Sequence, residues 1–255
     1  MKSICMLFFT VIVTLSIPSA AKTVLITGAN RGIGLEFVRH YADARYNVIA
    51  TARNPDQADE LNAMAMGNKL IIVEELDVND FDKIDALAKK YEGTRIDVLI
   101  NNAGISSGGS DRLFGNIDYS TFEAVMNTNV RGPLKMTEAF AANVASSSEK
   151  KVVVVTSSEG SIGSVRSNLR PFYRASKSAV NMVMRNIAFT LKDQGVIVVL
   201  VNPGAVDTDM TAAARGRVPL RTTKLAVDEM VAVIDQANLE QTAVFYNFDG
   251  LELPW

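Results

Sequence analysis

Tyr173 and Lys177 are the two residues whose types and spacing point most directly to chemistry. They are four residues apart in a segment with helical periodicity, so both side chains lie on one face of a helix, about one turn apart. A free tyrosine has a pKa of about 10, and a nearby ammonium lowers that pKa because it favours the phenolate. The pair predicts a tyrosine that exchanges protons near neutral pH. An amphipathic helix face without catalytic function would show the same spacing.

A second chemical feature is the glycine-rich stretch TVLITGANRGIG at residues 23–34. The apolar run at 24–26 predicts a buried strand, and the apolar periodicity after Gly34 predicts a helix. A glycine turn between a strand and a helix N-terminus leaves backbone N–H groups free to bind an anion such as a pyrophosphate. The alternative is a turn that binds nothing. The residues expected to form the site are Gly28, Asn30, Arg31, Gly32, Ile33 and Gly34.

The end of the second predicted strand indicates which nucleotide would bind. Folds that prefer NAD place a carboxylate there, about 20 residues past the glycines, to accept a hydrogen bond from the ribose 2′-hydroxyl. This sequence has Ala52 at that position, followed by Arg53, and Arg31 lies within the glycine turn. Two guanidiniums without an acid favour a 2′-phosphate, so we expect NADP rather than NAD. Asp77 and Val78, after the third predicted strand, would border the adenine.

Composition limits the alternatives. The chain has 255 residues, of which 48% are hydrophobic and 21% charged, and its formal net charge is −2. It therefore suits one α/β domain and offers no basic surface for nucleic acid. Cys5 is the single cysteine, which excludes cysteine-ligated zinc, and His40 is the single histidine, which argues against a Ser-His-Asp triad. We expect no metal site.

Residues 1–21 have the pattern of a secretory signal peptide. Lys2 is followed by an apolar run at 4–17 and then by the small residues of the stretch PSAA. The run is short and contains hydroxyl residues, which favours a cleavable signal over a membrane anchor. We expect membrane contact only through this segment, if it remains uncleaved. The segment suggests export, whereas chemistry with NADP is expected in the cytosol, so the sequence leaves the location open.

Strand-like and helical segments alternate along residues 22–255. This alternation predicts one domain, a Rossmann-type, doubly wound parallel α/β sheet with helices on both faces. Ligands of such sheets bind at the carboxyl ends of the strands, where the strand order reverses. A long helix is expected to open at Pro171. The predicted strands are 24–26, 47–51, 70–73, 96–100, 152–155, 196–201 and 243–246.

Six motifs follow one another in the order T-G-x-x-x-G-x-G, N-N-A-G, N-V-R-G, a serine after the fifth strand, Y-x-x-x-K and P-G-x-V-x-T. Each is weak alone, but together they resemble the short-chain dehydrogenases/reductases over essentially all of residues 22–255. The form Y-R-A-S-K and the closing runs N-F-D-G and L-P-W resemble the C-factor-like carbonyl reductases within that family.

The resemblance implies a role for each matched residue. Tyr173 would be the general acid/base, which gives its proton to a carbonyl oxygen as hydride arrives from a nicotinamide. Lys177 would lower the pKa of Tyr173 and hold the nicotinamide ribose, and Asn129 would keep a water in the proton relay. The residues that would line the cofactor, besides Tyr173 and Lys177, are Asn101, Ala103, Gly104, Pro203, Gly204, Val206 and Thr208.

The resemblance also requires a serine that polarises the carbonyl. In the family this serine usually stands three residues before a glycine, which selects Ser157 through Gly160. The adjacent Ser158 is the alternative. Residues 163–170 would form a rim over the substrate.

These expectations define an NADPH-dependent oxidoreductase that transfers hydride, reversibly, to the carbonyl of a small ketone or aldehyde. The alternative is a nucleotide-binding, C-factor-like signalling or sensor protein with little turnover. The loops at 105–118, 163–170 and 209–220 carry no charge pattern that identifies the substrate. Members of the family commonly assemble through the helices that carry Asn129 and Tyr173, so a homo-oligomer is a further expectation.

Overall fold

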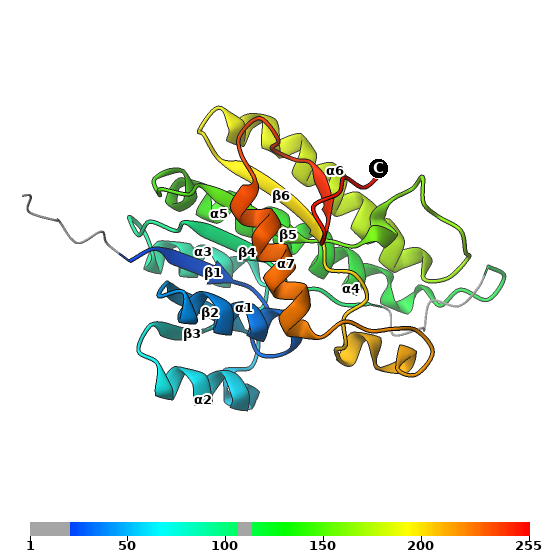
Figure 1. Cartoon of the computed structure of the whole chain (residues 1–255), viewed down its shortest axis with the longest axis horizontal. Coiled ribbons are helices and arrows are strands. Elements are labelled where there is room, and N and C mark those ends of the chain that lie inside the picture. Colours follow the sequence, from blue (N-terminus) through cyan, green and yellow to red (C-terminus); the bar gives the residue numbers. More distant parts are fainter. Residues whose placement is uncertain (1–20, 107–113) are drawn as a thin grey trace, which may run out of the picture.

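The computed structural model describes residues 21–106 and 114–255. Within them, seven strands form one parallel sheet in the order β3-β2-β1-β4-β5-β6-β7, and helices cover both of its faces (Figure 1). This is the doubly wound α/β sheet that the sequence predicts. The strand order reverses between β1 and β4, so the carboxyl ends of these two strands flank the switch point.

Each predicted strand is present, and its ends are shifted by at most two residues. The helices also follow the predicted pattern, including the long helix that opens at Pro171. The strands are β1 Thr23–Ile26, β2 Asn47–Ala52, β3 Ile71–Glu75, β4 Val98–Asn101, β5 Lys151–Val155, β6 Ile197–Asn202 and β7 Phe245–Asn247. The helices are α1 Gly32–Asp43, α2 Asp59–Gly67, α3 Phe81–Lys90, α4 Phe122–Met126, α5 Gly132–Ala145, α6 Pro171–Lys192 and α7 Thr223–Gln236.

The sheet separates two hydrophobic layers, because successive side chains of a strand point to opposite faces. Val24 and Ile26 of β1 pack with residues of α1 and α7, whereas Leu25 packs with residues of α3, α5 and α6. Both faces of the central strands are therefore buried. This explains why these strands appear in the sequence as uninterrupted apolar runs rather than as alternating ones.

Among the described residues, two of the connections that depart from regular α-helix are longer than three residues. A π-helical turn, Asn127–Arg131, joins α4 to α5 and contains the buried Asn129. The stretch 205–222, which has no regular pattern in the sequence, contains a 3₁₀ helix, Asp209–Ala214. Val206 forms a parallel bridge with Arg221, which closes this stretch into a compact loop at the carboxyl end of β6.

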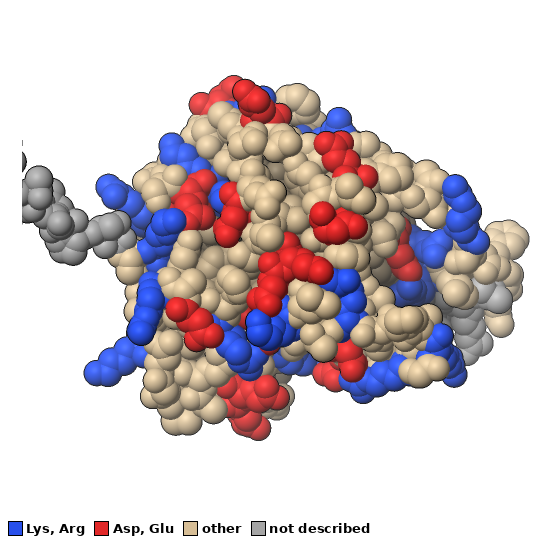
Figure 2. All heavy atoms as spheres, viewed as in Figure 1, with Lys and Arg blue, Asp and Glu red and all other residues tan. Residues whose placement is uncertain are grey.

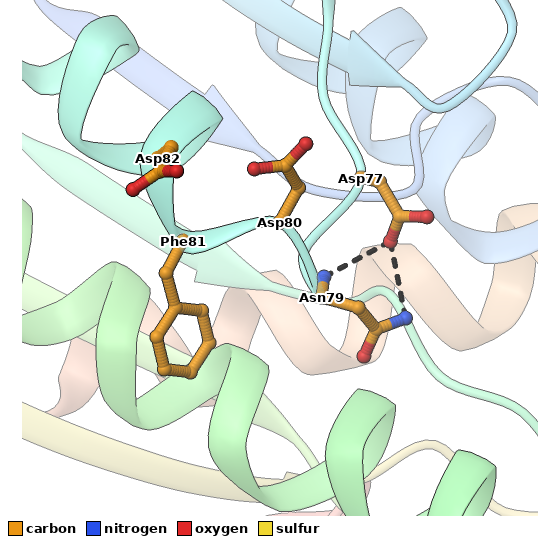
Figure 3. Close-up of a pocket in the computed structure, with 5 residues that line it drawn as sticks. All are labelled: Asp77, Asn79, Asp80, Phe81 and Asp82. Atoms are coloured by element: carbon orange, nitrogen blue, oxygen red, sulfur yellow. Dashed lines mark hydrogen bonds between the residues drawn. The ribbon is translucent and has the colours of Figure 1, made fainter.

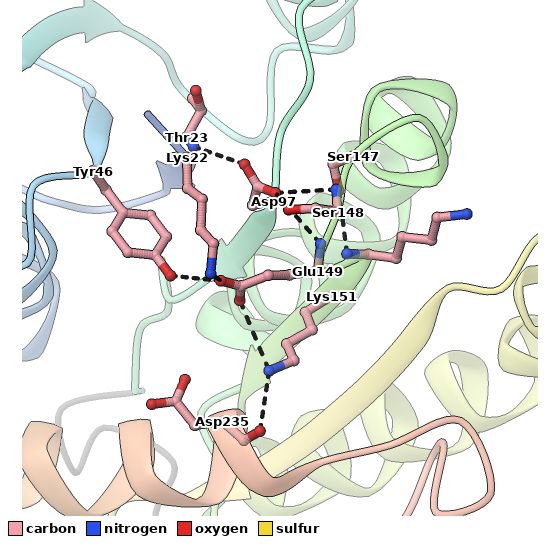
Figure 4. Close-up of polar contacts among 10 residues, drawn as sticks. Lys22, Thr23, Tyr46, Asp97, Ser147, Ser148, Glu149, Lys151 and Asp235 are labelled. Carbon is pink, nitrogen blue, oxygen red and sulfur yellow. Dashed lines mark hydrogen bonds and ion pairs between the residues drawn. The ribbon is translucent and has the colours of Figure 1, made fainter. Parts of the chain in front are cut away.

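Polar contacts fix the opposite, amino-terminal edge of the sheet (Figure 4). The Asp97 carboxylate accepts hydrogen bonds from the Thr23 N–H at 2.9 Å and from the Ser148 hydroxyl at 2.7 Å. Burial alone would raise the pKa of Asp97, but hydrogen bonds, that of Ser148 foremost, hold the pKa below its usual value. Glu149 accepts a hydrogen bond from Lys22 at 2.5 Å. The first described residues are thus tied to the sheet.

The surface of the protein carries charges of both signs (Figure 2). Lys and Arg are interspersed with Asp and Glu over the face in Figure 2, as expected for a net charge of −2. No helix among the described residues is both long and apolar enough to cross a membrane. The signal-like segment 1–21 lies outside the described residues except for Ala21, so its cleavage stays a prediction.

Candidate active site

Thr27 and Asn102 join the glycine turn to the loop that follows β4. The Thr27 hydroxyl accepts hydrogen bonds from the N–H groups of Asn102 and Ala103, both at 3.0 Å. In return, the Asn102 side chain donates to the carbonyls of Thr27 at 2.9 Å and Gly28 at 3.0 Å. These bonds connect β1 to β4 across the switch point. Neither Thr27 nor Asn102 was among the residues expected to bind cofactor, although Thr27 belongs to the T-G motif and Asn102 to the N-N-A-G motif.

Close approach explains two of the glycines. Gly28 has φ +65°, and a Cβ there would lie 2.9 Å from the Cα of Ala103. A Cβ on Gly34 would lie 2.1 Å from the carbonyl oxygen of Gly28 and 2.5 Å from Nδ2 of Asn102. The backbone turn is therefore bare above the N-terminus of α1, which is the geometry that binds a pyrophosphate. The bare turn fits the anion cradle that the sequence predicts, and nucleotide binding by these residues stays a prediction.

The candidate 2′-phosphate residues lie beside this turn. The N–H of Ala29 donates to the carbonyl of Thr51 at 2.9 Å, which brings the turn to the carboxyl end of β2. Ala52 is buried there, its neighbour on β3 is Glu75, and the Glu75 carboxylate is paired with Lys83 at 2.5 Å. Arg53 is exposed.

Arg31 forms an exposed ion pair with Asp209, from the loop after β6. An exposed pair of this kind contributes on the order of 0–1 kcal/mol, so Arg31 remains available to an anion.

Asp77 lies past the end of β3 (Figure 3), and Val78 follows it in the chain. The Asp77 carboxylate accepts from the backbone N–H and the side-chain amide of Asn79, at 2.9 and 3.0 Å, and these residues line a cleft. Val78 is buried, and a Cβ on Gly132 would lie 3.0 Å from its Cγ2. Tyr173, Ser157 and Lys177 do not line this cleft, and its place on the adenine side stays a prediction.

Tyr173, Lys177 and Ser157 meet at the carboxyl end of β5. The Tyr173 side chain is hydrogen-bonded to that of Ser157, and the Lys177 Nζ lies 5.7 Å from the centre of the Tyr173 ring. Lys177 donates to the carbonyl of Val155, the last residue of β5, at 3.0 Å. Ser158 is exposed, whereas Ser157 is partly buried. The contacts favour Ser157 over Ser158 as the serine that faces the tyrosine.

The pKa of Tyr173 moves against the sequence-based expectation. Burial raises it, and the hydrogen bond with Ser157 offsets only part of this effect. Burial also lowers the pKa of Lys177 to about 8, because the interior disfavours an ammonium. The expectation considered only the attraction between phenolate and ammonium and left out the cost of burying both groups.

Asn129 uses its whole side-chain amide within the protein. Its Oδ1 accepts the Ile105 N–H at 2.8 Å, and its Nδ2 donates to the Ile105 carbonyl at 2.8 Å and to Ser176 Oγ at 3.0 Å. The side chain therefore fastens the loop after β4 to helix α6. Oδ1 of Asn129 keeps a second lone pair, and the expected role of Asn129 in holding a water stays a prediction. A Cβ on Gly104 would lie 3.3 Å from Oδ1 of Asn129 and 3.8 Å from Nζ of Lys177.

Three further expected residues come to the same edge of the sheet. Gly32 faces Thr208, since a Cβ on Gly32 would lie 3.3 Å from its Cγ2. Gly204 has φ +75° and lies against Phe248. Asn101 is buried in β4, and its amide donates to Thr137 of α5 at 3.2 Å, so its expected place beside the cofactor stays a prediction. Asn30 lies in the glycine turn, Ile33 in the first turn of α1, and Pro203 and Val206 in the loop after β6.

Two charged residues beside Tyr173 were not anticipated. Arg170, which has φ +54° and precedes Pro171, lies with its guanidinium carbon 5.6 Å from the centre of the Tyr173 ring. It is paired with Glu159 from the turn after Ser157. An arginine before the helix-opening proline was the only sequence signal, and its partner is remote in the chain. Among the described residues, no group of three His, Cys, Asp or Glu side chains could hold a metal ion.

Comparison with known proteins decides the family. Residues 22–218 match the family model of the short chain dehydrogenases. The chain belongs to this family. It is therefore an oxidoreductase, as the motifs predict. An uncharacterized oxidoreductase of Schizosaccharomyces pombe is 30% identical over 250 residues, which cover 91% of this chain and 96% of that protein.

Two further proteins are informative. The C-signal of Myxococcus xanthus is 35% identical over 160 residues, which cover 63% of this chain and 93% of that protein. The solved structure of an NADPH-bound carbonyl reductase from chicken fatty liver superimposes with a TM-score of 0.85 at 29% identity and covers 92% of this chain and 99% of that one. The resemblance to C-factor-like and carbonyl reductase proteins is thus confirmed.

Gly34→Ala tests the glycine turn of this short-chain dehydrogenase. The added methyl group meets backbone at 2.1 Å, so we expect destabilisation by about 1–3 kcal/mol and loss of nucleotide binding. Gly67→Ala is the control: nothing lies within 4 Å of a Cβ there, and the helix gains about 0.5–1 kcal/mol. Urea denaturation and nucleotide titration measure both effects. Normal binding by Gly34→Ala would contradict the close approach.

Lys177→Met tests the burial of the ammonium. The pKa of Lys177 falls from 10.5 to about 8, so the unfolded chain binds more protons between these values and wild-type stability rises with pH there. Below pH 8 the full cost, about 3 kcal/mol, remains. After subtracting about 1 kcal/mol for the lost bond to Val155, we expect the variant to be more stable by about 2 kcal/mol at pH 7.

This advantage should shrink as the pH rises through 10.5, above which the lysine of the wild-type protein is neutral in both the folded and the unfolded state. Urea denaturation of both proteins across this range measures it. The same substitution at the exposed Lys192 provides the control. A stability difference at residue 177 that does not change with pH would show that the ammonium is not desolvated.

Proposed function

We propose that this chain is an NADPH-dependent carbonyl reductase in which Tyr173 gives its proton to the oxygen of a small ketone or aldehyde. The observation that carries the proposal is the contact between the Tyr173 and Ser157 side chains, with Lys177 one helical turn away. A phenol and a hydroxyl side by side can both donate to one carbonyl oxygen. Such donors stabilise the developing alkoxide, each by about 3 kcal/mol.

The raised pKa of Tyr173 suits reduction. Burial holds the phenol in its protonated form at neutral pH, and this is the form that donates a proton. Lys177, whose pKa is lowered to about 8, can accept or release a proton near neutral pH behind the tyrosine. Its distance to the Tyr173 ring also lets an ammonium stabilise the phenolate formed by proton transfer.

The bound cofactor supplies the hydride, and the residues present fit it. Gly28 and Gly34 leave the backbone bare at the N-terminus of α1, where a pyrophosphate binds. Ala52 stands where an NAD-binding fold has an acid, while Arg53 and Arg31 can bind a 2′-phosphate. The similarity to a carbonyl reductase solved with NADPH supports the same choice. Thr208, which lies over Gly32, would border the nicotinamide.

The signalling alternative has one relative in its favour, the C-signal of Myxococcus xanthus. A nucleotide sensor without turnover would not need a tyrosine hydrogen-bonded to a serine beside a buried lysine. We therefore favour the reductase. Oxidation of NADPH in the presence of a panel of aldehydes and ketones, followed by absorbance, separates the two functions.

Tyr173→Phe is the decisive substitution for the reductase. Loss of the proton donor should lower kcat at least about 100-fold and leave NADPH binding unchanged. Tyr246→Phe is a matched control, because Tyr246 is 7% exposed and Tyr173 8%. Steady-state kinetics and NADPH fluorescence titration provide the two readouts. Near-wild-type turnover by Tyr173→Phe would refute the assignment.

Arg53→Ala tests the choice of nucleotide. A charge-assisted contact to the 2′-phosphate contributes about 1.5–3 kcal/mol, so the Kd for NADPH should rise by about 10- to 100-fold while that for NADH stays constant. Arg95→Ala is the control, because Arg95 is exposed before β4, at the amino-terminal edge of the sheet. Equal weakening of NADPH and NADH would contradict a role for Arg53 at the phosphate.

A further inference from the structure

We propose that the side-chain amides of Asn202 and Asn247, with the Asp249 carboxylate at their end, form an oriented chain of hydrogen bonds that positions Ser157 for catalysis. The inference rests on the proposed function, because it concerns the serine that would polarise the carbonyl. These three residues touch neither Tyr173 nor Lys177 through any contact described above. Asn202 lies at the end of β6, Asn247 at the end of β7 and Asp249 just beyond it, all far from Ser157 in the sequence.

The chain of contacts is continuous. The Ser158 N–H donates to Oδ1 of Asn202 at 2.9 Å. Nδ2 of Asn202 donates to Oδ1 of Asn247 at 2.7 Å, and Nδ2 of Asn247 donates to the Asp249 carboxylate at 3.0 Å. Asn202 is only 4% exposed, so its amide has little access to water that could replace these partners.

The carboxylate at the end gives the chain its direction. An ionised Asp249 only accepts hydrogen bonds, so Asn247 must turn its NH₂ group toward it. The Oδ1 of Asn247 then faces Asn202 and can only accept, which forces Asn202 to turn its NH₂ group toward Asn247. The Oδ1 of Asn202 is left pointing at the Ser158 N–H. A flip of either amide would set like groups against each other at hydrogen-bonding distance.

This contact fixes the peptide unit that joins Ser157 to Ser158. Its N–H is held by Asn202, and its carbonyl oxygen accepts the Gly160 N–H at 2.8 Å. A peptide unit is planar, so holding it at both ends fixes the plane in which the Ser157 Cα lies, and the Ser157 Oγ is itself held because it accepts the Glu159 N–H at 3.2 Å. The Ser157 hydroxyl is then directed toward Tyr173, to which it is hydrogen-bonded.

The same carboxyl-terminal segment supports the loop at a second point. The Leu253 N–H donates to the carbonyl of Phe245 in β7 at 2.8 Å, so the segment folds back along this strand. At its end, the carbonyl of Trp255 accepts the Gly163 N–H at 3.0 Å. The turn that carries Ser157 is therefore braced from residues 247–255 on both sides of Gly160.

Two substitutions of similar size at position 202 test the proposal. Asn202→Leu and Asn202→Asp both lose the donor to Asn247, but only Asn202→Asp keeps an acceptor for the Ser158 N–H. A misplaced catalytic group costs about 100-fold in rate, so kcat of Asn202→Leu should fall by about 10- to 100-fold. Asn202→Asp combined with Asp249→Asn should stay close to wild type, because Asn247 can then turn over, donate to the carboxylate at position 202 and accept from the amide at position 249. The Kd for NADPH should not change in either, because the glycine turn is untouched.

The assay uses the full chain with NADPH and para-nitrobenzaldehyde as the probe, and circular dichroism and thermal melting verify folding. Asp249→Ala, at an exposed position, releases Asn247 and should lower kcat, whereas Asp249→Asn keeps an acceptor and should not. Wild-type kcat in Asn202→Leu, or an equal loss in the folded double variant Asn202→Asp with Asp249→Asn, would overturn the proposal. If Asn202→Leu does not fold, unchanged kcat in Asp249→Ala overturns it.

Failure of the proposed function gives a different result. A wild-type protein that binds NADPH but reduces no carbonyl would end the reductase assignment itself. Turnover that Tyr173→Phe abolishes but that the substitutions at 202 and 249 leave intact would end only the positioning role.

Discussion

The hydrogen bonds between Thr27 and Asn102 hold together the two halves of the sheet at the place where a nucleotide would bind. They cross the switch point between β1 and β4, where no helix connects the two carboxyl ends directly. The loop that they anchor continues to Ile105, which Asn129 fastens to α6. This small cluster of hydrogen bonds thus sets the distance between the glycine turn and the helix that carries Tyr173.

The other half of the site is held against an energetic cost. Burial opposes the charged forms of both Tyr173 and Lys177, so it raises the pKa of Tyr173 and lowers that of Lys177. The apolar side of α6, with Val180 and Met184, packs into the core and holds both side chains in place. The hydrophobic layer therefore offsets the cost of burying a phenol that stays protonated and a lysine that exchanges protons near neutral pH, and stability is lost where chemistry is gained.

The sequence predicted the features that depend on local pattern. Strands buried on both faces appear as apolar runs, and the glycine turn follows from the absence of side chains at fixed positions. It could not distinguish Asn101 from Asn102, because which of these two neighbours points to α5 depends on the exact residue at which β4 ends. It also missed the pairing of Glu159 with Arg170 and the direction of the Tyr173 pKa. Both depend on burial among segments remote in the chain.

The two halves of the site are fixed by different means, and this explains where their supports lie. The cofactor half depends on close backbone contacts at Gly28 and Gly34, which are rigid because no side chain intervenes. The catalytic half depends on side-chain amides, and an amide can turn over unless a neighbour dictates its orientation. A chain of amides keeps one orientation when the group at its end can only accept hydrogen bonds. Asp249, in the closing run N-F-D-G, is such an end, which gives a residue outside the catalytic motifs a physical reason to act on them.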